Sequence, residues 1–221
     1  LHLPAMRYLV VLALTVLLLA SCGSGGGSGA TSWKRDYWGH RPGPKGFSTV
    51  FLDAGHGGRD PGAVARSNGV REKDLTLDTV KRVQRKLGGR VKVRLIRSGG
   101  EFVDLDERVR RASTRDGAIL VSIHYNAGPS GWNGPENYYW RVDSHGLATR
   151  LQRELDKASP FNGPNRGKVR RRLRLTRNPN VPSVLVECGY LSHPSEASRC
   201  ADAAYRDRLA SAIARAILDQ Q

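Results

Sequence analysis

Apolar residues follow two alternating periods along this chain from residue 49 to its C-terminus. Short apolar runs typical of strands are separated by longer stretches in which apolar residues recur every three or four positions, as in a helix. The strand-like runs cover residues 50–53, 91–96, 118–124, 137–142, 169–175 and 184–186. The helical stretches cover residues 74–87, 104–113, 147–158 and 205–217. This order predicts one α/β domain, a three-layer αβα sandwich around a mainly parallel (mixed) sheet.

The residues before this domain predict export. Arg7 precedes an apolar run that is shorter than the roughly 20 residues of a membrane-spanning helix, and small residues follow it. Leu19-Ala20-Ser21-Cys22 resembles the bacterial lipobox, in which the cysteine is lipidated. We therefore expect residues 1–22 to be a signal peptide with a lipobox ending at Cys22. An ordinary signal peptide and an N-terminal membrane anchor are the alternatives.

Composition divides the remainder into a linker and one folded unit. Residues 23–46 are rich in glycine and serine and then in proline, which is typical of a flexible linker. Residues 47–221 are enough for one hydrophobic core and hardly for two. We expect them to form a single catalytic domain that is a monomer, without a second wall-binding domain.

The net charge of +16 favours a polyanionic partner. No nucleic-acid-binding motif accompanies this charge, so we expect no nucleic acid partner. Six of the cations lie in the ten residues from Lys168 to Arg177. This segment could contact an anionic wall polymer or lipid headgroups, or it could be a solvated sheet edge protected by its charge.

Two cysteines beyond Cys22 lie twelve residues apart, at Cys188 and Cys200. In an oxidising envelope they could form a disulfide bond. Two buried free thiols are the equal alternative, because the sequence does not supply the distance between their Cα atoms.

Four polar residues carry the candidate chemistry: His56, Glu72, His124 and Glu187. Three of them follow predicted strands, and open α/β sheets bind ligands at the carboxyl ends of their strands. Two histidines and one carboxylate form the open three-ligand set of catalytic zinc, and the second carboxylate remains as a proton carrier. These residues could instead be ordinary loop residues. The neighbouring glycines do not form a dinucleotide loop, because Asp60 occupies the third glycine position.

Five ordered motifs give this interpretation its specificity, and they cover nearly the whole predicted domain. They are VFLDAGHGGRDPGA, REKDLTL, LIRSGGEFVDLDERVRRAS, LVSIHYNA and PSVLVECGYLSHPSE. Together they resemble the zinc-dependent N-acetylmuramoyl-L-alanine amidases of the Amidase_3 family. The departures are small: proline is commoner than Ala54 in the first motif, and asparagine is commoner than His193 in the last.

This resemblance implies one Zn²⁺ per chain, with His56, Glu72 and His124 as its ligands and Glu187 as the catalytic residue. It implies cleavage of the amide between N-acetylmuramic acid and L-alanine in peptidoglycan by a lipoprotein of the cell envelope. Asp53 and Asn126 flank the ligands, and we expect them to support a ligand or contact substrate. The short segment between residues 140 and 147 predicts that no inserted plug covers the site.

Two other functions remain open at this stage. A zinc peptidase on a related scaffold would cut between amino acids of the stem peptide. A wall-binding lipoprotein with a degenerate site would bind the wall without cleaving it, although all four site residues are present. Product analysis distinguishes these three functions.

Overall fold

The computed structural model describes residues 43–114, 116–177 and 180–221. The predicted signal peptide, Cys22 and most of the predicted linker lie outside these residues. Within them, no helix is long and apolar enough to cross a membrane.

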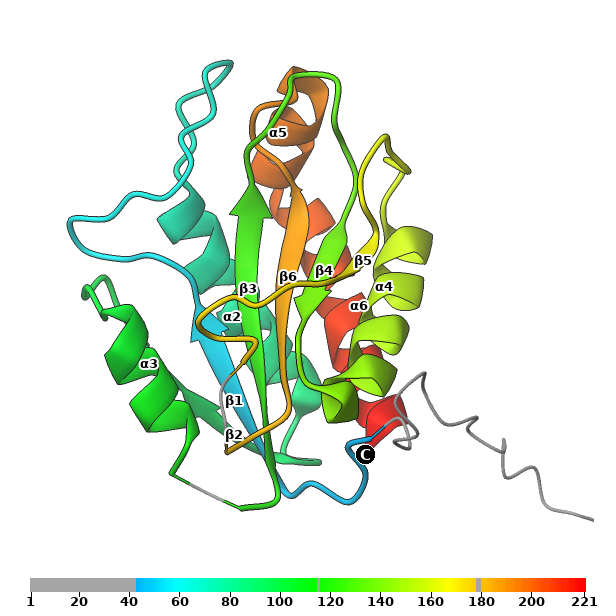
Figure 1. The fold of residues 1–221 in the computed structure, drawn as a ribbon. Coiled ribbons are helices and arrows are strands. Elements are labelled where there is room, and N and C mark those ends of the chain that lie inside the picture. The colour runs from blue at the N-terminus through cyan, green and yellow to red at the C-terminus, as the bar shows by residue number, and fades with distance from the viewer. Residues whose placement is uncertain (1–42, 115, 178–179) are drawn as a thin grey trace, which may run out of the picture. The chain divides into compact units, whose positions relative to one another are not determined.

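A six-stranded mixed sheet with the order β2-β1-β3-β6-β4-β5 forms the centre of the domain (Figure 1). Its strands are β1 (Thr49–Ala54), β2 (Lys92–Leu95), β3 (Ala118–Asn126), β4 (Glu136–Tyr139), β5 (Lys168–Arg170) and β6 (Ser183–Tyr190). The β4–β6 pair is antiparallel, and the other four neighbouring pairs are parallel. The predicted α/β sandwich with a mainly parallel sheet is confirmed.

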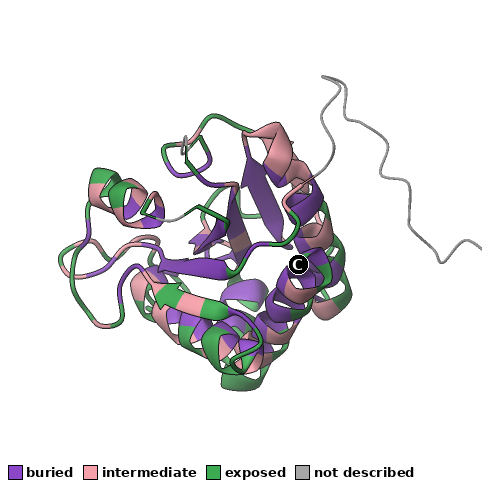
Figure 2. Cartoon of the chain, turned by 90° about the horizontal axis from the view of Figure 1, so that it is seen from below, coloured by how far each residue is buried: buried purple, intermediate pink, exposed green. Residues whose placement is uncertain are grey.

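Helices cover the two faces of this sheet unequally (Figure 1). The helices are α2 (Glu72–Leu87), α3 (Leu105–Ala112), α4 (His145–Ala158), α5 (Pro194–Ala201) and α6 (Ala203–Gln220), with a 3₁₀ turn η1 at Val142–Ser144. The large core lies between the sheet and α2, α4 and α6. The second core is smaller and is covered by α3 and by the chain after β5. Figure 2 shows that the central strands are buried, whereas edge strand β2 is exposed or intermediate along its length and the surrounding helices are exposed on their outer sides.

Two strands are longer than the sequence predicts. β3 continues past His124 to Asn126, and β6 continues past Glu187 to Tyr190. Tyr125 and Cys188 are buried on the opposite face and pack in the large core, so the alternation of a strand persists through the polar positions. His124 and Glu187 therefore lie within strands and not at their ends.

The segment predicted as a strand at residues 169–175 is mostly not one. Only Lys168–Arg170 pairs, as edge strand β5, and the following chain crosses the open face of the sheet (Figure 1). Leu175 and Val181 enter the small core there, and this burial draws the chain away from the edge. The interpretation of the whole segment as a solvated sheet edge is wrong beyond Arg170.

Helix α5 was not predicted, and it is tied to the sheet by a buried carboxylate. His193 caps its N-terminus, and Pro194 occupies the first turn. The Glu196 side chain accepts hydrogen bonds from the backbone N–H of Tyr190 at 2.8 Å and of Gly134 at 3.0 Å. Glu196 thereby joins the end of β6 to the loop that precedes β4.

We predict that Glu196→Ala lowers the free energy of unfolding by about 2 kcal/mol or more, because it leaves two buried backbone N–H groups without an acceptor. Urea denaturation measures this loss. Glu196→Gln is the control, since it keeps one acceptor oxygen and most of the volume, and it should cost less. A loss within about 0.5 kcal/mol for the alanine variant would contradict this role.

The same residue gives the stability a defined pH dependence. Burial raises the pKa of Glu196 to about 7, although the two backbone donors lower it, and the ordinary value is 4.5. As pH rises, the unfolded chain loses this proton near pH 4.5, whereas the folded protein keeps it until about pH 7. The contribution of Glu196 to the free energy of unfolding therefore falls between these two pH values. In Glu196→Gln this part of the pH dependence should disappear.

Candidate metal centre and active site

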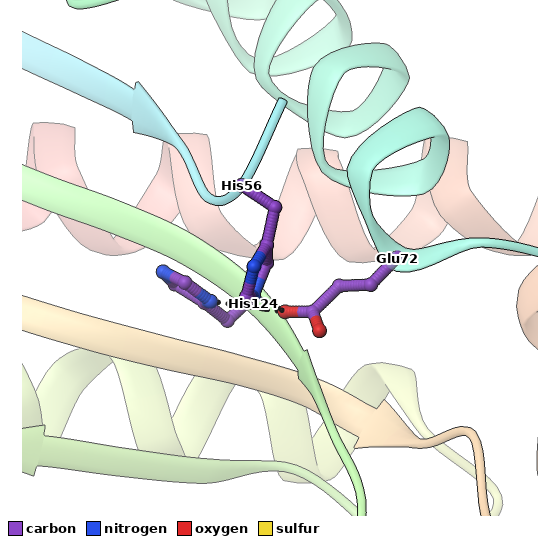
Figure 3. A group of neighbouring side chains, drawn as sticks. All are labelled: His56, Glu72 and His124. Atoms are coloured by element: carbon purple, nitrogen blue, oxygen red, sulfur yellow. Dashed lines mark hydrogen bonds and ion pairs between the residues drawn. The ribbon is translucent and has the colours of Figure 1, made fainter. Parts of the chain in front are cut away.

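Three side chains meet around a single carboxylate oxygen. Glu72 Oε1 lies 3.0 Å from Nε2 of His56 and 2.9 Å from Nδ1 of His124 (Figure 3). The donor atoms of all three residues lie within 4.8 Å of one another. The predicted trio is thus brought together from the loop after β1, the first residue of α2 and strand β3.

The carboxylate of Glu72 is fixed by backbone groups as well. Its Oε1 accepts a hydrogen bond from the Tyr125 N–H at 3.1 Å, and its Oε2 accepts one from Ala63 at 2.8 Å. Burial alone would raise the pKa of Glu72, but hydrogen bonds with His124 and His56 and their charges lower it well below its usual range. The charged form that a metal ion requires is therefore the stable form.

Glu72 raises the pKa of both imidazoles. Burial disfavours the protonated form of His124, yet the hydrogen bond with Glu72 and its charge raise the pKa of His124 to about 9. In His56, burial is likewise outweighed by Glu72, and the pKa is raised. A metal ion replaces these protons when it binds, so binding at this cluster releases protons.

The residues fit a zinc ion. Neighbouring ligands of a tetrahedral zinc ion, bonded at about 2.0–2.1 Å, lie roughly 3.3 Å apart, close to the donor spacing of this cluster. Oε2 of Glu187, on the strand next to His124, is buried and has no hydrogen-bond partner among the described residues. An unpaired buried polar atom is costly, and a water ligand of a bound cation would supply a partner.

Asp60 holds His56 in place, and its role was not predicted from the sequence. Its Oδ2 lies 2.8 Å from Nδ1 of His56, and its Oδ1 accepts a hydrogen bond from the Gly62 N–H at 3.0 Å. A carboxylate on the second nitrogen of a metal-binding histidine sets the tautomer and the ring orientation. The signal was visible in the sequence, since Asp60 is the residue that breaks the dinucleotide pattern.

Two glycines make room for the ligands. A Cβ atom on Gly55 would lie 2.3 Å from Cε1 and 2.5 Å from Nε2 of the His124 ring. A Cβ atom on Gly62, which has a φ of +65°, would lie 2.5 Å from Oε2 of Glu72. The glycines of the first motif therefore accommodate side chains of the metal cluster.

Asp53 is not a substrate contact, because its side chain is 0% exposed. It binds the buried Arg108 guanidinium and accepts a hydrogen bond from Ser122 Oγ at 2.7 Å. Arg108 in turn donates to the carbonyl oxygens of Ala54 at 2.7 Å and of His56 at 2.6 Å. Asp53 thus supports the loop that carries His56 through Arg108.

A second buried arginine holds the same loop. Arg97 donates to the carbonyl oxygens of Ala54 at 2.9 Å and Gly55 at 2.9 Å, and also to Lys73 at 2.9 Å. These bonds join the loop after β1 to the first turn of α2. Arg97 and Arg108 both lie in the third motif, and their individual roles were not predicted.

Glu187 stands beside the metal cluster in the sheet. On β6 it pairs with His124 of β3 on one side and with Glu136 of β4 on the other, so the three side chains share one face. Burial, together with the charges of Glu72 and Glu136, raises the pKa of Glu187 to about 7, although the charges of His124 and His56 lower it. A nearby divalent cation would favour its ionised form.

Asn126 contacts Glu136 on β4, the strand beyond β6. Its Nδ2 lies 3.4 Å from Oε2 of the fully buried Glu136, and its Oδ1 accepts from the Ala127 N–H at 2.8 Å. Glu136 also accepts hydrogen bonds from the hydroxyls of Tyr138 and Tyr190. This carboxylate was not among the predicted site residues.

A cleft of about 600 Å³ opens over the cluster. Its lining includes the following residues: His56, Asp60, Phe102, Val103, Asp104, Leu105, Asp106, Arg108, His124, Arg174 and Leu175. The N-terminal end of α3 forms one wall, and the segment after β5 contributes Arg174 and Leu175. The basic segment is therefore part of the active-site cleft.

Cys188 and Cys200 are both buried free thiols in the structure. Of the two alternatives for this pair, the structure has the free thiols, and no disulfide bond joins the two residues.

Comparison with known proteins agrees with this geometry. Residues 50–219 match the family model Amidase_3, described as N-acetylmuramoyl-L-alanine amidase. The chain belongs to this amidase family.

Relatives in the family differ in length from this chain. N-acetylmuramoyl-L-alanine amidase LytC of Bacillus subtilis is 38% identical over 172 residues, which are 75% of this chain and 34% of LytC. The chain therefore spans about a third of that relative. The germination-specific N-acetylmuramoyl-L-alanine amidase of B. subtilis is 32% identical over 187 residues, 76% of this chain and 78% of the relative.

Solved structures of the family share the fold. The catalytic domain of CwlV, an N-acetylmuramoyl-L-alanine amidase from Bacillus (Paenibacillus) polymyxa, superposes with a TM-score of 0.74 at 33% identity, covering 79% of this chain and 99% of that domain. AmiC2 of Nostoc punctiforme has a TM-score of 0.73 at 35% identity, covering 80% of this chain and 98% of AmiC2.

In this family member, we predict that Asp60→Asn lowers the affinity for zinc about 10- to 100-fold, because His56 loses the carboxylate that orients it. Competition with a chromophoric chelator measures the affinity. Asp207→Asn is the matched control, since Asp207 is an aspartate of similar exposure that pairs with Lys86 on α2. Equal affinities in the two variants would contradict this role of Asp60.

We also predict that Gly55→Ala abolishes high-affinity zinc binding while the domain stays folded, because the new methyl group occupies the position of the His124 ring. Bound metal is measured by elemental analysis, and folding by circular dichroism. Gly100→Ala is the control, since no heavy atom lies within 4 Å of its added Cβ. A Gly55→Ala protein with full metal content would contradict the packing argument.

Proposed function

We propose that this chain hydrolyses the amide bond between N-acetylmuramic acid and L-alanine in peptidoglycan, with one zinc ion per chain. The observation that carries the proposal is the His56–Glu72–His124 cluster beside the unpartnered Oε2 of Glu187 on the next strand. Membership in the amidase family supports the choice of substrate.

His56, Glu72 and His124 would hold the zinc ion. When bound, zinc lowers the pKa of a water molecule and polarises a carbonyl group, which are the two requirements for hydrolysis of an unreactive amide. The chain itself supplies the fixed carboxylate and the two oriented imidazoles. The Asp60 carboxylate and the Arg97 and Arg108 guanidiniums keep these ligands in place.

Glu187 acts as general base and then as general acid. Its carboxylate accepts a proton from the attacking water while the oxygen bonds to the carbon of the lactyl carbonyl group. It then delivers that proton to the nitrogen of L-alanine as the C–N bond breaks, which yields a carboxylic acid and a free amine. Its burial and its raised pKa suit a group that must both accept and release a proton.

Two alternatives of different kinds share parts of this evidence. A zinc peptidase that cuts within the stem peptide could use the same cluster and the same proton carrier. A wall-binding protein without activity would leave the buried oxygen of Glu187 without a function. Family membership and the complete set of site residues favour the amidase.

We further propose that the protein works in the cell envelope as a monomer on a lipid anchor. The sequence of residues 1–22 supports export and lipidation at Cys22, and residues 23–46 have the composition of a linker to the domain. The basic residues of the 168–177 segment would keep the domain close to anionic material of the wall or membrane.

The test is mass analysis of muropeptides after incubation with the protein, with and without a zinc chelator. We expect free muramoyl lactyl groups and peptides that begin with L-alanine, and we expect their loss when the chelator is present. New termini inside the stem would establish the peptidase. The absence of any product from the zinc-loaded protein would establish the inactive alternative.

We predict that Glu187→Gln lowers kcat by about 10²- to 10⁴-fold, the range of general acid–base catalysis, while its zinc content remains near one ion per chain. His56→Ala is the companion variant and should lose bound zinc as well as activity. Turnover by Glu187→Gln near the wild-type rate would remove Glu187 from the mechanism.

A further inference from the structure

A second polar cluster lies directly beside the proton carrier. Glu136 is the register partner of Glu187, and it is surrounded by the hydroxyls of Tyr138 and Tyr190 and by Arg166. We call these four residues the Arg166 cluster: Glu136, Tyr138, Tyr190 and Arg166. They continue the row of side chains that starts with His124 and Glu187 across the same face of the sheet.

Arg166 is fixed by Glu136 and remains partly exposed. Its backbone N–H donates to Oε1 of Glu136 at 2.8 Å, and its Nη2 donates to Oε2 at 3.2 Å and to the Tyr138 hydroxyl. The guanidinium also lies over the rings of Trp132, at 5.3 Å, and Tyr138, at 5.4 Å. The side chain is nevertheless 42% exposed, whereas Glu136 is 0% exposed. These contacts fix the position of the guanidinium, and its exposed part can donate to an incoming anion.

A second cation approaches the same ring. Arg171, which begins the crossing segment, is exposed, and its guanidinium lies 5.9 Å from the centre of the Tyr138 ring. The wall of the cleft at α3 has a different character. It carries the exposed apolar side chains of Phe102 and Leu105, and Asp106 there is paired with Arg174. Arg166 and Arg171 lie beyond the residues that line this cleft, on the side of β4 and β5.

The distances match the spacing of a peptide stem. Neighbouring strands lie about 5 Å apart, so the Arg166 guanidinium is on the order of 8 Å from Glu187, one strand spacing plus one hydrogen bond. An extended peptide advances about 3.3 Å per residue, which places the second and third residues after the cleaved bond roughly 7–10 Å away. The residues that follow L-alanine in peptidoglycan stems carry free carboxylates.

We propose that Arg166 and Arg171 bind a carboxylate of the stem peptide, so that the peptide leaves the catalytic centre across Tyr138 toward β5 and the glycan lies toward α3. This inference rests on the proposed amidase function and adds to it the orientation of the substrate. It also assigns part of the basic segment to substrate binding in the cleft. Both arginines are positioning residues, since neither reaches the cleaved bond.

Two matched muropeptides test this orientation, one with free stem carboxylates and one in which they are converted to carboxamides. We expect the wild-type protein to prefer the free carboxylates by about 10-fold or more in kcat/KM, mainly through KM, as for a charge-assisted bidentate contact. Arg171→Gln should reduce this preference several-fold. The pair Arg166→Gln with Arg171→Gln should remove the preference.

Binding gives a readout that does not need catalysis. Calorimetry of the two muropeptides with Glu187→Gln should show the same preference in Kd, and Arg171→Gln added to that variant should weaken it. Arg208→Gln is the matched control, because Arg208 is also exposed and lies over a tyrosine ring at 5.3 Å, but on α6. In Arg166→Gln the buried Glu136 loses its paired cation, so circular dichroism is used to check that this variant folds. Arg171→Gln leaves no buried charge unpaired, so it tests the proposal without that risk to folding.

Equal Kd and kcat/KM for the two muropeptides in the wild-type protein would overturn the orientation while the amidase function stands. An unchanged preference in the Arg166–Arg171 pair variant would overturn it as well. A carboxylate preference in Kd, together with no hydrolysis of either muropeptide by the zinc-loaded wild-type protein, would support the binding of the stem and reject the amidase function.

Discussion

The site depends on one buried carboxylate that is shared by two histidines. Glu72 is the first residue of α2, and its two oxygens contact the loop after β1 and strand β3, so it joins these three regions. A charged carboxylate in this position is tolerable only while its partners remain in place. If one of these elements moves, the buried carboxylate loses hydrogen-bond partners, and the folded state loses free energy of stabilisation. The geometry of the metal cluster is therefore coupled to the folding of the domain.

The glycine-rich loop after β1 would otherwise carry buried carbonyl groups without donors. Arg97 and Arg108 supply these donors from the chain after β2 and from α3. Asp53 neutralises Arg108 at the floor of the site, whereas Arg97 donates to backbone carbonyl oxygens and to the Thr76 hydroxyl. The loop leaves the sheet where it turns at His56, so its carbonyl oxygens no longer pair with a neighbouring strand. The two guanidiniums supply hydrogen bonds to these carbonyl oxygens instead.

The same face of the sheet that carries the chemistry is only partly covered. α3 and the crossing segment pack over the lower part of the strands, where Leu175 and Val181 are buried. Above them, the strands continue as a row of polar side chains that ends in the Arg166 cluster. The division between a covered apolar half and an open polar half is what places a cleft at the catalytic row.

The sequence by itself determined the fold class, the order of the elements and the identity of the three clustered residues, because periodicity and ordered motifs are local properties. It did not reveal Asp60 beside His56, the two arginines behind the loop, or Glu136 beside Glu187. Asp60 is four residues from His56 and stands out in the first motif, but its contact depends on how the loop folds. The other contacts join residues that are distant in the sequence, through the folding of the chain or the pairing of strands, and no spacing along the sequence encodes them.

The tertiary structure also decided where the basic residues lie. An alternation of basic and apolar residues is compatible with an edge strand, and the sequence offers no reason to end that strand at Arg170. Burial of Leu175 and Val181 against the open face draws the chain across the sheet instead. That long-range hydrophobic contact brings a charged segment into the cleft, and only the packed structure reveals it.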